Sequence, residues 1–378
     1  MATERLRVLH VLEALEGGTA RHVRDLVVCG TRADHVVIIP ATRPGCLTDT
    51  EVADEMRAAG ADVRIVDMRR STLASRNAVA LVKVWRIARQ VRPSVIHGHS
   101  SIGGVVARLV GRMLGIPAVW TPNGVLVGRF PLMIERGLSR WTAQTIAVSR
   151  TEAGLIGDLE LSPPDRVATI PNGLAPFEID DAPDVRAMAG IPAGAPLVGC
   201  VARLVDQKGI DIFLEMVSTL IKERPDAYAV LIGTGPLEAL AKETAQRLDR
   251  FRWLEGFNGS RAVLPQFTVF VLLSRYEGAP YTVMEAMSQA CACVVTDVVG
   301  SRDLIVDGES GVLVPPEDPE TAARVVGDLL ADAGRRSELG TAARRRVAES
   351  FTADGMAEET VRLYEALSSL QETRRTRR

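Results

Sequence analysis

The feature that most constrains this chain is a regular alternation of short apolar runs with longer segments of helical periodicity. Apolar runs of this length are typical of buried strands, and the segments between them are typical of helices. Expected strands in the first half are 6–12, 35–40, 63–66, 95–97, 118–121, 145–148 and 167–170. Those in the second half are 197–201, 229–232, 252–254, 269–273 and 293–296. Because strands that alternate with helices form parallel sheets, the sequence predicts an α/β fold with two doubly wound sheets.

A proline-rich segment, 171–195, separates the two series of strands and is the expected seam between domains. The sequence therefore predicts an N-terminal Rossmann-like domain over 1–175 and a C-terminal Rossmann-like domain over 176–350. Residues 351–378 are predicted to form a last amphipathic helix, about 352–370, followed by a disordered basic tail that could equally be a membrane-attracted patch.

Length and composition favour a cytoplasmic protein. At 378 residues the chain is long enough for two domains with cores of their own. Its five cysteines are scattered and form no CxxC pair, which is typical of a reducing compartment. No apolar stretch reaches the roughly 18 residues that indicate a transmembrane helix. The chain opens on an expected strand rather than a secretory signal.

Basic residues are concentrated in one part of the N-terminal half. Residues 68–150 hold 13 lysines and arginines and a single acidic residue, Glu135. One interpretation is a set of solvated helix faces. The other is a surface for anionic lipid, or for an acceptor that carries a pyrophosphate. Nucleic acid is not expected as a partner, because no aromatic residues are interleaved with the basic ones and no nucleic-acid motif is present.

Two glutamates eight positions apart, Glu277 and Glu285, are the strongest indication of a ligand site. The first lies in the loop after the expected strand 269–273, and the second about one turn into an expected helix, 282–290. Open α/β sheets bind ligands at such loops, at the carboxyl ends of the strands. Two acceptor groups at a fixed separation suit a ligand rich in hydroxyl groups, such as a sugar on a ribonucleotide.

A second group of residues would suit a pyrophosphate. Arg203 ends an expected strand, and Lys208 and Gly209 precede a helix. Two cations and a helix N-terminus would then surround one loop. The alternative is a surface ion pair with Asp206 or Asp211.

Glycine turns follow two other expected strands, at Gly17 and Gly18 and at Gly233. Glycine lets the backbone approach a phosphate closely. A tight turn between strand and helix is the alternative explanation for each, because a short glycine motif by itself is a weak signal.

Two histidines, His97 and His99, end the fourth expected strand. They could contact a polar substrate, or they could be loop histidines with local hydrogen bonds. No carboxylate or cysteine is spaced to complete a metal site with them, and the chain has no D-x-D triplet. No metal is therefore expected.

Taken together, these segments resemble the retaining glycosyltransferases of the GT-B fold, specifically family 4 (glycosyl transferases group 1). The resemblance covers nearly the whole chain in order, and its most specific part is the E-x7-E signature combined with the Arg and Lys pair. The matching segments are 10–18 with 21–23, 97–104, 147–149, 170–173, 201–204, 274–287 and 311–316.

The resemblance implies a role for each residue of the donor site. Glu277 would bind the hydroxyls of the donor sugar, and Glu285 would bind those of the ribose. Arg203 and Lys208 would neutralise the diphosphate and stabilise it as a leaving group, in place of the metal of D-x-D enzymes. The loop that would meet sugar and phosphate is Gly278, Ala279, Pro280, Tyr281 and Thr282, in which proline has no N–H to offer.

The resemblance also implies which domain binds each substrate. The two domains would face a central cleft, with the donor bound mainly by the C-terminal domain and the acceptor by the N-terminal domain. The last helix would cross back to the N-terminal domain. Gly17 would let the N-terminal domain close on the phosphates or the acceptor, and Gly18 and Gly233 would belong with it to the donor site.

One position departs from the family pattern. After the fifth strand the family has a histidine before a glycine, whereas this chain has Asn123 before Gly124. An asparagine can donate or accept a hydrogen bond but cannot act as a base at neutral pH. Asn123 would therefore orient substrate without moving a proton.

The resulting prediction is a retaining, metal-independent glycosyltransferase of polysaccharide biosynthesis, cytoplasmic or peripheral at the inner face of the membrane. It would need no cofactor and would move a hexose or N-acetylhexosamine from a nucleotide diphosphate sugar, with UDP favoured. The expected acceptor is a glycan or a polyprenyl-linked glycan. The alternatives are a GT-B sugar-nucleotide epimerase or phosphorylase, or a GT-B-like protein that only binds partners.

Overall fold

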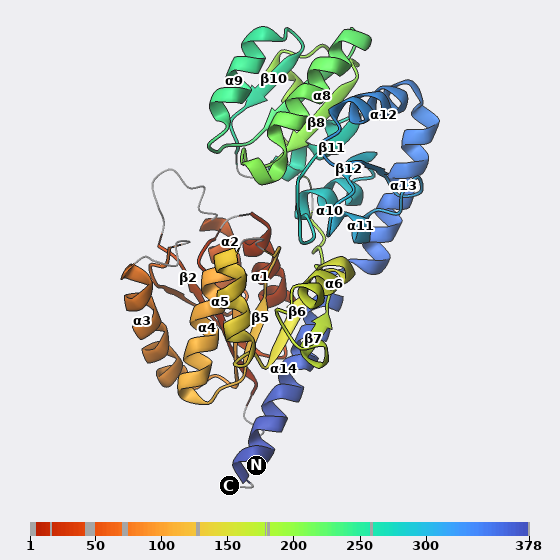
Figure 1. The fold of residues 1–378 in the computed structure, drawn as a ribbon. Coiled ribbons are helices and arrows are strands. Elements are labelled where there is room, and N and C mark those ends of the chain that lie inside the picture. Colours follow the sequence, from red (N-terminus) through yellow and green to blue (C-terminus); the bar gives the residue numbers. More distant parts are fainter. Residues whose placement is uncertain are drawn as a thin grey trace. The chain divides into compact units, whose positions relative to one another are not determined.

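A computed structural model describes residues 5–15, 17–41, 50–69, 75–125, 129–177, 179, 182–257 and 260–376, without the side chains of 75–76, 129–130, 260 and 374–376. The chain divides into two compact units (Figure 1). Unit 1 comprises Met1–Ala175 and Thr352–Arg378, and unit 2 comprises Pro176–Phe351.

Unit 1 is built on a seven-stranded sheet in the order β3-β2-β1-β4-β5-β6-β7, in which every pairing is parallel. The order reverses between β1 and β4, which makes their carboxyl ends the switch point of the sheet. The strands are β1 (Arg7–Val11), β2 (Asp34–Ile39), β3 (Asp62–Ile65), β4 (Val95–His99), β5 (Ala118–Thr121), β6 (Gln144–Ala147) and β7 (Val167–Thr169). The helices between them are α1 (Gly17–Cys29), α2 (Thr50–Ala58), α3 (Ser75–Val91), α4 (Ser100–Leu114), α5 (Arg129–Ser139), α6 (Arg150–Asp158) and the short η1 (Pro164–Arg166).

The last helix of the chain, α14 (Ala353–Thr376), also belongs to unit 1. Its buried Met356, Val361 and Tyr364 share a core cluster with residues of β1, α1 and β4. Gly173 lies where the chain passes the start of this helix, because a Cβ there would come within 2.2 Å of the Thr352 carbonyl oxygen. The helix continues to Thr376, past the expected end at 370, so residues 374–376 of the tail are helical rather than disordered. The last two residues, 377–378, lie outside the described residues.

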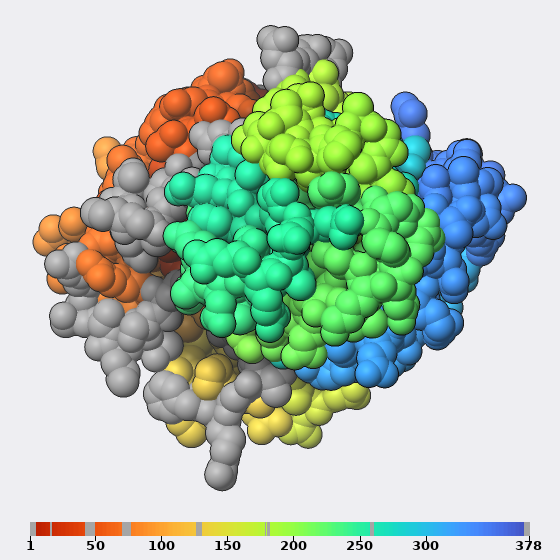
Figure 2. Space-filling view, turned by 90° about the horizontal axis from the view of Figure 1, so that it is seen from above, coloured from red at the N-terminus to blue at the C-terminus, as the bar shows by residue number. Residues whose placement is uncertain are grey.

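Unit 2 repeats the plan with a six-stranded parallel sheet in the order β10-β9-β8-β11-β12-β13. Its switch point lies between β8 and β11. The strands are β8 (Leu197–Val201), β9 (Tyr228–Ile232), β10 (Phe251–Leu254), β11 (Val269–Leu272), β12 (Cys293–Thr296) and β13 (Val312–Val314). The helices are α7 (Val185–Ala189), η2 (Asp206–Lys208), α8 (Ile210–Glu223), α9 (Glu238–Arg247), η3 (Ser260–Gln266), α10 (Tyr281–Ser288), α11 (Ser301–Leu304), α12 (Pro319–Ala331) and α13 (Ala333–Ser350). In Figure 2 the green and teal segments at the surface of unit 2 include α8 and α9, and the blue segments beside them belong to the C-terminal part of the unit.

The strands of both sheets carry the apolar sequence that a sheet covered on both faces requires. Strand β8, for example, is buried at every position, and β11 is as well. The predicted α/β class with two doubly wound sheets is therefore confirmed. Among the described residues, no helix is both long enough and apolar enough to span a membrane.

Candidate active site

The loops that follow β8 and β11 lie together at the switch point of unit 2. Gly209, with φ +57°, ends the β8 loop, and a Cβ on it would lie 2.0 Å from the carbonyl oxygen of Leu273. Gly233, after β9, would in the same way bring a Cβ within 1.8 Å of the Ala202 carbonyl oxygen. Glycine at these positions therefore lets three loops approach one another at the carboxyl edge of the sheet.

The centre of this edge is an ion pair between Lys208 and Glu277. The lysine Nζ lies 2.5 Å from Glu277 Oε1, and the Ser274 hydroxyl donates to the same oxygen at 2.6 Å. The two charged side chains are only 14 and 6% exposed. A buried carboxylate held by two donors is fixed in place, and an ammonium has further N–H groups for an anionic ligand. The alternative pairing of Lys208 with Asp206 or Asp211 is not the one that the structure shows.

Those two aspartates instead bind Arg275, a residue that the sequence analysis gave no role. Its guanidinium makes two hydrogen bonds to Asp211, at 2.9 and 2.7 Å, and ion pairs with Asp206 and Glu317. The hydrogen bond with Asp211 raises the pKa of Arg275 and lowers the pKa of Asp211. The backbone N–H of Arg275 also donates to the backbone carbonyl oxygen of Gln207, at 2.8 Å. Arg275 therefore fastens the loop that carries Glu277 to the loop that carries Lys208.

The second glutamate of the signature, Glu285, lies on α10 and is 1% exposed. The helix begins at Tyr281, directly after Pro280, so Glu285 lies just over one turn inside it. The preceding loop packs closely on the loop after β12, since a Cβ on Gly300 would lie 2.2 Å from the Gly278 carbonyl oxygen. Of the loop residues, Ala279 and Thr282 are half-buried. Arg203, also half-buried, lies two residues beyond the end of β8.

In unit 1, the predicted glycines Gly17 and Gly18 form the exposed first turn of α1. Glu16, which precedes them, lies outside the described residues. An exposed glycine pair at a helix N-terminus leaves backbone N–H groups accessible to an anion.

Asn123 follows β5 in a left-handed conformation, with φ +56°. Its buried Nδ2 has no hydrogen-bond partner among the described residues. The neighbouring Gly124 N–H donates to Glu152 Oε1 at 2.7 Å, and the Val148 N–H donates to Glu152 Oε2 at 2.8 Å. Burial raises the pKa of Glu152 to about 7. Glu152 therefore holds the loops after β5 and β6, a role with no sequence signal beyond an acidic residue in the first turn of α6.

All five histidines of the chain are buried in unit 1 and are called the histidine cluster below: His10, His22, His35, His97 and His99. Burial lowers the pKa of each, to about 4 for His22. The sequence analysis singled out only the last two, because the members are far apart in the chain.

His97 is enclosed rather than presented to a ligand. Its Nδ1 is 2.5 Å from the Tyr364 hydroxyl and its Nε2 is 2.7 Å from the Thr121 hydroxyl, and it has no exposed surface. Both of its ring nitrogens are occupied by protein hydroxyls, so, contrary to the expectation of a direct contact, the structure leaves His97 no nitrogen for the acceptor. His99 is also enclosed, but its Nδ1 has no partner among the described residues.

The cluster also contains the one group of possible metal ligands found among the described residues. Ligand atoms of His10, His97 and His99 all lie within 4.8 Å of one another. His10 is the third ligand that sequence spacing did not supply. Both ring nitrogens of His10 and of His97 already have hydrogen-bond partners, which an ion would have to displace.

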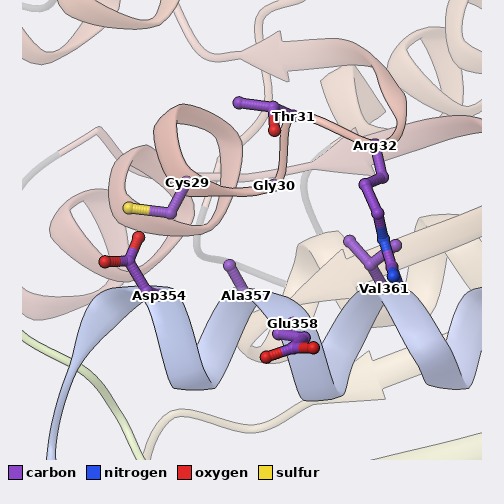
Figure 3. Close-up of a pocket in the computed structure, with 8 residues that line it drawn as sticks. All are labelled: Cys29, Gly30, Thr31, Arg32, Asp354, Ala357, Glu358 and Val361. Carbon is purple, nitrogen blue, oxygen red and sulfur yellow. The ribbon is translucent and has the colours of Figure 1, made fainter.

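A pocket of about 230 Å³ lies elsewhere in unit 1, where the end of α1 faces α14 (Figure 3). Cys29 and Asp354 point toward each other in it, and burial raises the pKa of the thiol to about 12. A thiol with this pKa stays protonated and is a poor nucleophile. The helix α1 runs from the carboxyl end of β1 to the amino end of β2, so this pocket is at the opposite edge from the switch point.

Fold and site together define a class of protein. Two Rossmann-like units, with cations and carboxylates at the carboxyl edge of the second, define a glycosyltransferase of the GT-B type. The Glycosyltransferase Family 4 model matches residues 16–176, and the model described as Glycosyl transferases group 1 matches residues 195–332. The chain belongs to this family, and it is an enzyme, as the sequence predicted.

Individual relatives agree with the family models. Alpha-maltose-1-phosphate synthase of Mycolicibacterium smegmatis is 28% identical over 312 residues, which cover 73% of this chain and 80% of that one. UDP-Gal:alpha-D-GlcNAc-diphosphoundecaprenol alpha-1,3-galactosyltransferase of Escherichia coli is 25% identical over 260 residues, covering 63 and 67%. The crystal structure of Anabaena Alr3699/HepE in complex with UDP-glucose has a TM-score of 0.81 and 17% identity, covering 96 and 100%. This last similarity shows the fold alone.

Proposed function

We propose that this protein is a retaining glycosyltransferase that works without a metal and moves a hexose or N-acetylhexosamine from a nucleotide diphosphate sugar. UDP is the favoured nucleotide, and the acceptor is a glycan or a lipid-linked glycan. The observation that carries the proposal is the buried Lys208–Glu277 pair at the switch point of unit 2, together with the buried Glu285 on the following helix, α10. The relatives support it through their names, which include a UDP-galactose donor and a diphosphoundecaprenol-linked acceptor.

The donor would lie along the carboxyl edge of unit 2. Glu277, held by Ser274, would accept hydrogen bonds from the hydroxyls of the sugar, and Glu285 would accept those of the ribose. The Lys208 ammonium would donate hydrogen bonds to both Glu277 and the diphosphate. One pair of side chains would then hold both the sugar and the phosphate. Arg203 would add a second positive charge to the departing diphosphate. Gly278 and Gly233 would keep the backbone close to the ligand.

The acceptor would bind to unit 1. Gly17 and Gly18 offer backbone N–H groups, and Asn123 offers an amide donor that is unused among the described residues. Because asparagine is not a base, the proton of the attacking hydroxyl would leave with the diphosphate oxygen. His97 would support the site from within the core.

An anionic membrane surface is a further proposed partner. Helix α3 exposes Val79 and Val82, which are 57 and 47% exposed, beside the exposed cations Lys83 and Arg86. Met113 on α4 is also 57% exposed. Exposed apolar side chains with cations on the same helix suit the interface of an anionic bilayer, where they would bring the enzyme to a lipid-linked acceptor.

The test is a screen of UDP, GDP and ADP sugars that measures thermal stabilisation and then release of the nucleoside diphosphate. A ligand of the folded state raises its apparent stability. We expect one class of donor to stabilise the protein and to be consumed when acceptor is added. Epimerisation without acceptor, or phosphorolysis by inorganic phosphate, would instead indicate the related GT-B reactions. Binding without any turnover would indicate a non-catalytic protein, and no binding at all would refute the proposal.

A further inference from the structure

The hydrogen bonds of the histidine cluster determine which nitrogen of each ring carries the hydrogen. The carbonyl oxygen of Gly30 can only accept, so His35 donates to it from Nε2 at 2.9 Å. In a neutral ring the other nitrogen is an acceptor, so His10 donates from Nε2 to His35 Nδ1 at 3.0 Å. By the same argument His99 donates from Nε2 to His10 Nδ1 at 3.1 Å. The chain of donors leaves His99 Nδ1 with a lone pair.

A second ring of the cluster ends in the same way. The Asn172 amide oxygen can only accept, so His22 donates to it from Nδ1 at 2.9 Å, which leaves a lone pair on His22 Nε2. His22 Nε2 and His99 Nδ1 are both buried and have no hydrogen-bond partner among the described residues. The centroids of these two rings are 5.4 Å apart.

These two nitrogens lie at the place where an open α/β sheet binds its ligand. His99 is the last residue of β4 and the N-cap of α4, and His22 lies on α1, which follows β1. β1 and β4 flank the switch point of the unit 1 sheet. Buried polar groups without partners are rare in proteins, and each calls for a group that satisfies it. Two lone pairs call for a group that brings two hydrogens.

We propose that His22 Nε2 and His99 Nδ1 bind a vicinal diol of the acceptor sugar, one hydroxyl to each nitrogen. The inference rests on the proposed function and names the acceptor chemistry that unit 1 recognises. An anion that carries no O–H group, such as a carboxylate or a fully ionised phosphate, is disfavoured, because its oxygens would face two lone pairs. His10, His35 and Asn172 are positioning residues, since they fix the tautomers. Because neither nitrogen is exposed, the proposal requires a local movement of unit 1 that admits the diol.

Nuclear magnetic resonance of the imidazole nitrogens tests this directly, because the chain has only five histidines. In protein labelled with ¹⁵N at histidine, long-range ¹H–¹⁵N spectra give the tautomer of each ring. We expect the hydrogen on Nε2 of His10, His35 and His99, and on Nδ1 of His22. A hydrogen on Nδ1 of His99 or on Nε2 of His22 would overturn the proposal, because the lone pair would be absent.

Titration with small probes then identifies the ligand. With UDP present, methyl α-glucopyranoside and methyl α-mannopyranoside serve as diols, and inorganic phosphate serves as the anion. We expect at least one hexoside to change the ¹⁵N chemical shifts of both His22 Nε2 and His99 Nδ1 until the site is saturated. Phosphate should leave both chemical shifts unchanged. A shift with phosphate would contradict the proposal. No shift with either hexoside would also contradict it, and would mean that the pair holds water only.

Variants at position 22 separate binding from packing. His22→Phe keeps a ring but removes the acceptor, so the hexoside-dependent shift at His99 should weaken about tenfold in apparent Kd. His22→Gln keeps an acceptor oxygen and should recover most of that loss. Cys29→Ser, on the same helix, is the matched control and should bind the hexoside as the wild type does. Equal weakening in the Phe and Gln variants would indicate a packing role only.

Failure of this inference can be told apart from failure of the proposed function. The proposed site for UDP sugars lies in unit 2, with Lys208 and Glu285, whereas the proposed diol site lies in unit 1. A protein that binds no nucleotide sugar refutes the proposed function whatever its tautomers are. A protein that binds and consumes the donor, but whose imidazoles ignore hexosides, refutes only the diol site.

Discussion

Two buried groups of unit 1 should respond to acid in opposite directions. Burial lowers the pKa of His22 from 6.5 to about 4 and raises the pKa of Glu152 from 4.5 to about 7. As the pH falls below 6.5, the unfolded chain binds a proton at His22 that the folded protein does not, so His22 lowers the free energy of unfolding. Over the same range the unfolded Glu152 is still ionised while the folded one is protonated. The free-energy cost of burying an ionised Glu152 is therefore removed as the pH falls below about 7, and the free energy of unfolding rises.

The linkage relation gives the size of each effect. Between about pH 7.5 and about pH 5, a folded pKa of about 4 against 6.5 when unfolded makes His22 reduce the free energy of unfolding by about 2 kcal/mol. A folded pKa of about 7 against 4.5 makes Glu152 increase it by about 2 kcal/mol. These two contributions nearly cancel each other. The other four buried histidines, whose pKa values are lowered as well, destabilise the folded state on acidification in every variant. The contribution of His22 or Glu152 is therefore measured as a difference from the wild type.

The assay is hydrogen exchange of unit 1 peptides in urea at the two pH values, for wild type, His22→Gln and Glu152→Gln. Exchange resolves unit 1 from unit 2, which a single bulk transition would not. Compared with wild type, His22→Gln should gain about 2 kcal/mol on acidification, and Glu152→Gln should lose about 2 kcal/mol. Identical pH dependence in wild type and His22→Gln would refute the argument, because it would mean that His22 titrates alike in both states.

Three further predictions concern the two units. Arg203→Ala should lower turnover by roughly 10- to 150-fold, the worth of one charge-assisted bond, and unchanged turnover in a donor-release assay would remove the leaving-group role. Arg275→Lys should raise the KM for the donor several-fold, because a point charge cannot make the paired bonds to Asp211, whereas the surface variant Arg224→Lys should behave as wild type. Exchanging Lys83 for Glu should weaken binding to vesicles that contain anionic lipid, in a sedimentation assay at low salt, by about 2 kcal/mol for a change of two charges. Equal binding would place the membrane contact elsewhere.

The fold was accessible from the sequence because its signals are local. Strand β11 is an apolar run bounded by turn residues, and such runs predicted every strand of both sheets except the three-residue β13. Helix α13 was missed because its buried face is narrow, with Leu339, Ala343 and Val347 set among arginines and glutamates. Apolar residues recur there with a period near 3.6, but too few of them are present to distinguish a helix from a charged loop.

The candidate site was only partly accessible, because its contacts join distant positions. Glu277 and Lys208 are both in recognisable segments, yet their pairing spans 69 positions and no spacing rule predicts it. Arg275 lies inside the signature segment, but its role depends on Asp211, 64 positions earlier. The histidine cluster depends on strand order, which brings β1 beside β4 and so places His10 against His99.

Corrections came where burial mattered more than position. His97 ends its segment at the carboxyl edge of a strand, which is a reasonable place for a ligand contact. The return of α14 brings Tyr364 against it and closes it off, and nothing in the sequence near His97 signals that contact. In His99, two residues further on, His10 contacts only Nε2, so Nδ1 is left without a partner among the described residues.

The central claim is that the Lys208–Glu277 pair and Glu285 form a donor site for a nucleotide sugar. The most direct measurement is isothermal titration calorimetry of UDP-glucose and UDP-N-acetylglucosamine with wild type and Lys208→Met. We expect one site per chain for at least one donor, and a loss of roughly tenfold or more in affinity when the ammonium is removed. Equal affinity for wild type and variant, or no binding to the wild type, would contradict the account.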